Sequence, residues 1–146
     1  MERLLEELDG KIGCRLQVGG VWLKTKIQNF EDLEVYQKLF KLHWEIHELT
    51  MKFPKFEMYE LGSQLRRSSN SVPANLAEGW NNNHVNIYLE GINRAIGELQ
   101  ETRHHLSVAL RKGYLDKLTY DNIVARYVET AKMLYGLQNS LQKFKP

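Results

Sequence analysis

Apolar residues recur at the spacing of an α-helix from residue 29 to the end of the chain. Turn-forming residues break this periodicity at three places, so the pattern predicts four helices. Their expected ranges are 30–52, 57–78, 84–113 and 119–143. Helices of this length joined by short loops pack most simply as an antiparallel up-down bundle, in which each helix buries one apolar stripe. We therefore predict an all-α four-helix bundle.

Individual residues mark several of the predicted helix ends. Gly79 is expected to end the second helix as a left-handed cap, and Gly113 is expected to close the third. One of the three asparagines at 81–83 is expected to be the N-cap of the third helix. Pro73 lies inside the second helix, where it costs roughly 3 kcal/mol unless the helix bends. We therefore expect a kink between Ser69 and Pro73.

Residues 1–28 differ from the rest of the chain. A short amphipathic run at 1–9 is followed by glycines that interrupt any helix begun there, namely Gly10, Gly13, Gly19 and Gly20. The alternating residues at 21–27 are typical of a strand, but the sequence reveals no second strand to pair with it. We therefore divide the chain into an N-terminal extension of uncertain order, residues 1–28, and a four-helix bundle domain, residues 29–146.

The composition is that of an ordinary globular domain, with 42% apolar and 26% charged residues in a chain of 146. No apolar run approaches the roughly 20 residues that a membrane-spanning helix needs. The single cysteine, Cys14, cannot form an internal disulfide, and its position in a glycine-rich segment indicates an incidental residue. We expect a protein of the cytoplasm without a membrane partner.

The charge balance does not by itself indicate a nucleic-acid binder. The formal net charge is only +2, from 20 Lys and Arg against 18 Asp and Glu, so a basic surface has to come from clustering or from repetition in an oligomer. Lys52, Lys55, Arg66 and Arg67 cluster around the first turn between helices and the start of the second helix. They are candidates for phosphate contacts, and a solvated turn explains them equally well.

The predicted first helix carries apolar residues on two opposite sides. The first stripe consists of Leu33, Tyr36, Phe40, Trp44 and Met51, and the second of Val35, Leu39, Leu42, Ile46, Leu49 and Phe53. One bundle covers only one such stripe fully, so the other indicates either a partner subunit or cover by the N-terminal extension. We favour self-association.

The second helix carries a row of polar residues beside its apolar stripe. This polar row consists of Gln64, Arg67, Ser71, Asn75 and Glu78. Arg67 suits a bidentate contact with a carboxylate such as Glu78, but the two lie eleven residues apart, roughly 16 Å along one helix. Arg67 and Glu78 are therefore expected to find their partners on other helices, on another copy or on a ligand. We favour an interface network over an RNA-reading surface.

The sequence gives little support for catalysis, a cofactor or a bound metal. His43 and His47 are four residues apart and Glu101 precedes His104 by three, but a di-iron bundle needs two Glu-x-x-His pairs. The His-Glu-x-x-His motif of zinc proteases is missing, as are phosphate-binding glycine loops and nucleophile elbows. None of the arginines is followed after five to seven residues by histidine, as in helical ribonucleases of the HEPN type. We therefore expect no enzyme and no metal site.

Three aromatic residues are further candidates for contacts with nucleic-acid bases. Tyr59, Trp80 and Tyr88 lie at helix ends or on helical stripes, where aromatic rings usually pack against neighbouring helices. We expect all three to be packed.

Four sequence blocks resemble the 23S-rRNA intervening-sequence protein family across residues 29–146. They are NFEDLEVYQKLFKL (29–42), LGSQLRRSSNSVPANLAEG (61–79), IGELQE (96–101) and the Lys-Gly-Tyr turn (112–114). The Gln-x-x-Arg pattern of the family matches Gln64 and Arg67, and its Asn-x-Ala-Glu-Gly pattern matches residues 75–79. Members of that family are small four-helix bundles.

The resemblance also implies an assembly and a class of partner. Relatives of the family include Avd, the accessory protein of diversity-generating retroelements, which forms a barrel-shaped pentamer and binds nucleic acid and its reverse transcriptase. By this resemblance we expect a non-enzymatic homopentamer that acts as an RNA- or nucleoprotein-binding scaffold. The alternative is an Avd-like accessory protein that docks a reverse transcriptase or another protein partner.

Overall fold

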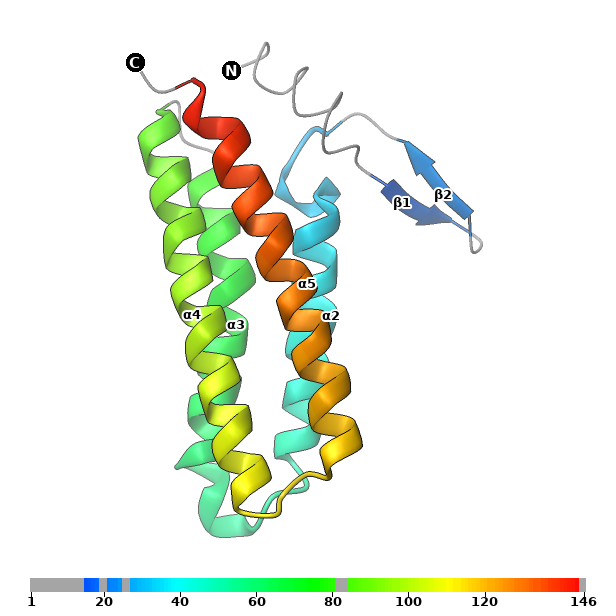
Figure 1. Ribbon diagram of the computed structural model, residues 1–146, viewed down its shortest axis with the longest axis vertical. Coiled ribbons are helices and arrows are strands. Elements are labelled where there is room, and N and C mark those ends of the chain that lie inside the picture. The colour runs from blue at the N-terminus through cyan, green and yellow to red at the C-terminus, as the bar shows by residue number, and fades with distance from the viewer. Residues whose placement is uncertain (1–14, 19–20, 25–26, 81–83, 145–146) are drawn as a thin grey trace.

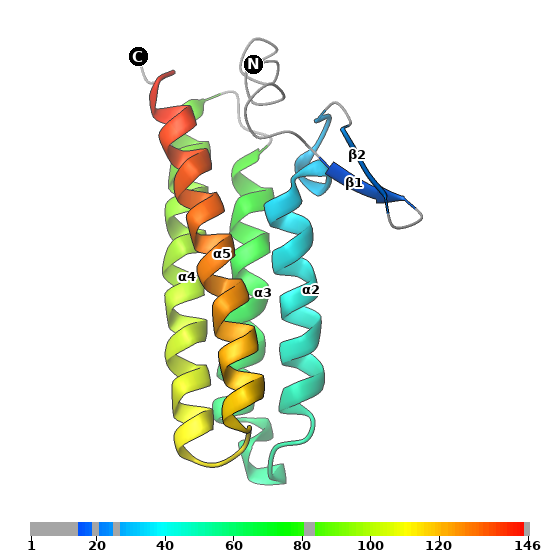
Figure 2. The ribbon, with the colours of Figure 1, turned by 45° about the vertical axis from the view of Figure 1, so that its right-hand side comes forward.

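The computed structural model describes residues 15–18, 21–24, 27–80 and 84–144. Four long helices run side by side and alternate in direction (Figures 1 and 2): α2 (Glu34–Thr50), α3 (Leu61–Trp80), α4 (Val85–Arg111) and α5 (Lys117–Gln142). Each helix turns an apolar stripe toward the common axis, where Ile46, Leu65, Leu99 and Leu134 are completely buried. The antiparallel four-helix bundle predicted from the periodicity is confirmed. None of the described helices combines the length and the apolar composition that crossing a membrane requires.

A small β-hairpin precedes the bundle. Strand β1 (Arg15–Val18) pairs antiparallel with β2 (Val21–Lys24), so that Val18 lies opposite Val21. Figures 1 and 2 both place the hairpin beside the start of α2. The strand expected within 21–27 therefore exists, and its supposed lack of a pairing partner is wrong. Only two residues, both glycine, separate the strands in the sequence, and this spacing is a recognised hairpin signal.

The first predicted helix is divided in two. A 3-10 helix, η1 (Phe30–Asp32), comes first, and α2 begins after Leu33, whose backbone is extended. A capping box starts η1: the Asn29 side chain accepts a hydrogen bond from the Glu31 amide at 2.8 Å, and an Asp32 carboxylate oxygen accepts one from the Asn29 amide at 3.1 Å.

The second predicted helix begins later and ends later than the sequence indicates. Pro54 is followed by a 3-10 turn, η2 (Lys55–Met58), and α3 continues as α-helix through Pro73 and past Gly79 to Trp80. The expected left-handed cap at Gly79 is wrong. Within the described residues only Gly113 has a positive φ, of 77°, and it follows the end of α4 as expected. The kink near Pro73 stays a prediction.

Gly79 instead serves the contact between α3 and α4. A Cβ atom added at Gly91 would lie 2.7 Å from the carbonyl oxygen of Asn75 and 3.1 Å from the Cα of Gly79. A Cβ atom added at Gly79 would lie 3.3 Å from the Cα of Tyr88. The two backbones therefore approach each other so closely that a side chain at Gly91 has no space.

The N-terminal ends of α4 and α5 differ from the predicted ones. The N-cap of α4 is His84, not one of the asparagines at 81–83, which lie outside the described residues together with Cys14 and residues 1–9. Helix α5 begins at Lys117, two residues before the expected start. Asp116 is its N-cap and accepts a hydrogen bond from the Thr119 amide at 2.8 Å.

Candidate nucleic-acid interface

Two of the four predicted phosphate-binding residues are free at one end of the bundle. Lys52 and Lys55 are exposed in the connection between α2 and α3, residues 51–60, and neither forms an ion pair with any other described residue. Figures 1 and 2 place this connection at the same end of the bundle as the turn between α4 and α5. These two ammonium groups are available to an external anion.

Arg66 has a different environment, because its guanidinium bonds inside the chain. One nitrogen donates to Thr50 Oγ1 at 3.1 Å and the other to the Met58 carbonyl oxygen at 2.6 Å. The side chain thus ties the α2–α3 connection to the end of α2. Two of its five N–H donors thus hold the connection in place, and we assign Arg66 to the positioning of this segment.

Arg67 points toward α4 and lies on another face than Arg66. Its side chain is exposed, and one guanidinium nitrogen lies 3.3 Å from Glu101 Oε1. The same carboxylate oxygen lies 3.3 Å from His105 Nε2. The predicted basic cluster is therefore split into two free lysines, one internally bonded arginine and one arginine in a surface ion pair.

A buried carboxylate joins the two connections at this end of the bundle. Glu57, 0% exposed, accepts hydrogen bonds from Lys112 Nζ at 2.7 Å, from the Tyr114 hydroxyl at 2.8 Å and from the Leu61 amide at 3.1 Å. The bond from Lys112 holds the pKa of Glu57 below its ordinary value, helped by the other two donors. Two residues of the Lys-Gly-Tyr block, Lys112 and Tyr114, therefore hold the α2–α3 connection against the end of α4 by hydrogen bonds to Glu57.

Two aromatic residues of the connection point outward, whereas the third, Phe53, is buried. Tyr59 is 87% exposed and Phe56 is 68% exposed. The expectation that Tyr59 packs against a helix is wrong, because η2 lies between α2 and α3 and turns this ring toward solvent. Trp80 and Tyr88 are packed as expected: both are buried, and their ring centroids lie 5.4 Å apart in an edge-to-face contact.

The polar row of α3 bonds largely within its own helix. Ser71 Oγ donates to the Arg67 carbonyl oxygen at 2.9 Å, and Asn75 Nδ2 donates to the Ser71 carbonyl oxygen at 2.8 Å. Short polar side chains of this kind reach the carbonyl oxygen one turn earlier in the helix. Arg67, by contrast, has its partner on another helix, Glu101 of α4. Gln64 and Glu78 are exposed, and Glu78 borders a shallow pocket of about 260 Å³ beside the contact of Gly79 with Gly91.

One side of α2 remains uncovered. Phe40 is 45% exposed, and Trp44 and Met51 are each 52% exposed; we call these three residues the exposed stripe. The rings form a series along the helix, with centroids 6.0 Å apart from Tyr36 to Phe40 and 6.3 Å apart from Phe40 to Trp44. The second predicted stripe faces the core, where Leu39, Leu42 and Ile46 are buried. Leu33, assigned to the first stripe, is also buried.

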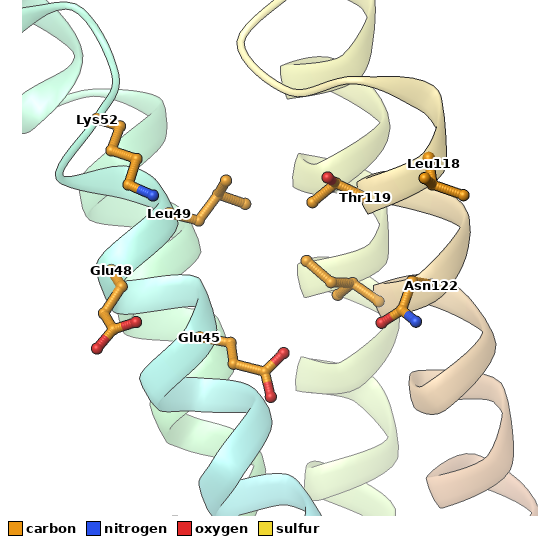
Figure 3. Close-up of a pocket in the computed structure, with 8 residues that line it drawn as sticks. Glu45, Glu48, Leu49, Lys52, Leu118, Thr119 and Asn122 are labelled. Carbon is orange, nitrogen blue, oxygen red and sulfur yellow. The ribbon is translucent and has the colours of Figure 1, made fainter.

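A groove between α2 and α5 was not predicted from the sequence. It has a volume of about 370 Å³, and Figure 3 shows Glu45, Glu48, Leu49 and Lys52 on its α2 side opposite Leu118, Thr119 and Asn122 on its α5 side. Leu118 is 82% exposed at this edge. The one sequence feature that could have indicated this groove is Leu118, an apolar residue in the first turn of α5 that lies off the apolar stripe of the helix.

The histidines make local contacts. His43 Nδ1 lies 2.9 Å from Ser69 Oγ at the α2–α3 contact, and burial, with the nearby His47, lowers the pKa of His43. Glu101 contacts His105 rather than His104. The part of the chain that the structure describes contains no group of three His, Cys, Asp or Glu side chains placed to hold a metal ion.

Comparison with known proteins places the bundle in a family. A crystal structure of a protein of unknown function from the S23 ribosomal protein family of Bacteroides thetaiotaomicron VPI-5482 has a similar fold, with a TM-score of 0.67. The two chains are 23% identical, and the match covers 72% of this chain and 95% of that chain. Curated proteins give no match. The model of the 23S rRNA-intervening sequence protein matches residues 31–136, from η1 into the second half of α5. The chain belongs to the 23S rRNA-intervening sequence protein family.

Proposed function

We propose that this protein is a non-enzymatic, ring-forming scaffold that binds RNA or a nucleoprotein in the cytoplasm. The observation that carries the proposal is the exposed stripe of α2, which one copy of the bundle leaves in contact with solvent. Exposed apolar side chains that recur on one side of a helix are typical of an interaction site. A sister copy is the occupant that the family resemblance favours.

The proposed ring requires a head-to-tail contact between copies. A stripe on one face of the bundle that meets a different face of the next copy makes a head-to-tail interface, and this kind of interface closes into a ring when the rotation permits. The resemblance to Avd makes five copies the expected number. Burial of Phe40, Trp44 and Met51 supplies the hydrophobic part of the association.

The lysines supply the proposed contact with RNA. Lys52 and Lys55 are exposed and unpaired within the described residues, and a ring repeats this pair once for each copy. Contacts of a near-neutral chain with phosphates are weak individually, but several contacts on one RNA molecule add through avidity. Affinity is therefore expected to depend on both the assembly and the salt concentration.

The first test measures the mass of the assembly in solution by sedimentation. The change Trp44→Ser is expected to shift the protein from a ring to smaller species, whereas Tyr135→Ser, at an exposed aromatic position on α5, leaves the mass unchanged. A wild-type protein that remains a monomer at micromolar concentration would refute the ring.

The second test measures binding to a structured RNA at several salt concentrations. Replacing both Lys52 and Lys55 by Gln is expected to lower affinity and to reduce the slope of log affinity against log salt by about 1 for each lysine. The matched control replaces Lys132 of α5 and Lys143, its C-cap residue, by Gln, which removes the same charge from exposed positions elsewhere. An equal loss of RNA affinity in the two variants would show that binding depends on the net charge of the protein and not on the positions of Lys52 and Lys55.

The groove between α2 and α5 favours a second candidate function, the docking of a protein such as a reverse transcriptase. Its exposed Leu118 and its volume of about 370 Å³ suit an apolar side chain of a partner, and Glu45 and Glu48 line the same groove. A reverse transcriptase gene next to the gene for this protein would favour docking. Co-purification of the two products that is lost in Leu118→Asp would support this function.

A further inference from the structure

Two aromatic rings are displayed on a firmly held turn at one end of the bundle. Phe56 and Tyr59 are the most exposed aromatic side chains among the described residues, at 68% and 87%. The two residues between them hold the turn: the Glu57 carboxylate is buried in three hydrogen bonds, and the Met58 carbonyl accepts one from Arg66. The rings are therefore presented by a turn that is anchored on both α3 and α4.

The same turn carries the two free lysines. Lys55 directly precedes Phe56, and Lys52 lies at the end of α2. The carboxylate of Glu57 is compensated by Lys112, at 2.7 Å, and Glu60 is the exposed acid of this segment. The local field is thus only moderately positive, and phosphate contacts alone would bind weakly.

We propose that Phe56 and Tyr59 form a stacking platform for the unpaired bases of single-stranded RNA, with Lys52 and Lys55 on the adjacent phosphates. The inference rests on the proposed RNA binding and specifies its ligand. Unpaired bases offer their faces to aromatic rings, whereas bases within a duplex are already stacked on each other. A contact between copies of the chain fits this turn less well, because lysine is depleted from the centres of protein interfaces.

The experiment compares the affinities of the full-length protein for a short single-stranded oligouridine and for an RNA duplex of equal length. Phe56→Ala and Tyr59→Ala are each expected to weaken binding of the oligouridine by about tenfold and to leave duplex binding nearly unchanged. Tyr59→Phe keeps the ring and is expected to retain affinity. Tyr135→Ala removes an exposed ring of α5 and serves as the matched control. Circular dichroism checks that each variant is folded.

The outcomes separate this inference from the proposed function. Wild-type protein that binds both RNAs, with affinities that the alanine variants do not change, would overturn the stacking platform and leave RNA binding intact. Wild-type protein that binds neither RNA would overturn both. Alanine variants with an altered assembly mass in the absence of RNA would assign the turn to contacts between copies and overturn the platform.

Discussion

The contact of Gly91 with α3 allows a quantitative test of the bundle. Replacing a helix-interior glycine by alanine ordinarily stabilises a protein by about 0.5–1 kcal/mol, because alanine loses less backbone freedom on folding. At Gly91 the added Cβ would lie 2.7 Å from a carbonyl oxygen and 3.1 Å from the Cα of Gly79. Both atoms belong to the backbone of α3, so relief requires the two helices to separate.

The expected cost of Gly91→Ala follows from this geometry. Overfilling a packed contact costs typically about 1–3 kcal/mol, which exceeds the gain from helix propensity. We therefore expect a net loss of about 1–2 kcal/mol in the free energy of unfolding. Gly97→Ala on the same helix has no neighbouring atom within 4 Å of the added Cβ and is expected to be stabilising. Gly79→Ala, with its nearest atom at 3.3 Å, should lie between them.

Urea unfolding followed by circular dichroism measures these differences, at one protein concentration because assembly contributes to stability. Each kcal/mol corresponds to a shift of about 2–4 °C in Tm for a chain of this size, so thermal unfolding gives an independent reading. Equal stabilisation by Gly91→Ala and Gly97→Ala would refute the close contact between α3 and α4.

Three further predictions concern buried groups. Folding lowers the pKa of the Glu57 carboxyl from 4.5, so the folded protein binds fewer protons at this group than the unfolded chain does. The contribution of ionised Glu57 to stability is full above pH 4.5 and is lost as the pH falls through the folded pKa. Glu57→Gln should therefore flatten the acid limb of a plot of unfolding free energy against pH. An unchanged acid limb would contradict this. Leu65→Ala, at a completely buried position, should cost about 2–5 kcal/mol in urea unfolding, whereas Leu118→Ala, at an exposed one, should change stability by less than about 0.5 kcal/mol. Thr102→Val removes the 2.9 Å hydrogen bond to Ser68 Oγ and should cost about 1 kcal/mol; no loss would show that this buried bond is dispensable.

The helical periodicity predicts the bundle because each long helix must bury its own apolar stripe. The second stripe of α2 and the end of α4 just before Gly113 follow from local patterns of apolar and turn-forming residues. Local patterns do not predict that the first helix is divided at Leu33 or that α3 begins late. A 3-10 turn and the first turn of an α-helix have nearly the same sequence requirements.

The candidate site was harder to predict because its residues act through distant partners. Glu57 carries no signal in its own segment, and its role appears only when Lys112 and Tyr114 are brought beside it. Arg66 and Arg67 are adjacent in sequence but point toward α2 and α4 respectively, so one holds a turn and the other forms a surface ion pair. Adjacent residues on a helix are about 100° apart, and the packing of neighbouring helices decides what each one meets.

The sequence alone determined the class of the fold, the number of helices and the surplus of apolar surface on α2, because periodicity is a local property of the chain. Tertiary structure decided which glycine permits two helices to touch, which polar groups are satisfied internally and which aromatic rings remain in solvent. Gly79 illustrates the difference: its position at a helix end suggested a cap, whereas its neighbour across the bundle, Gly91, assigns it to a close contact. Such assignments depend on atoms far away in sequence, and only the folded chain brings them together.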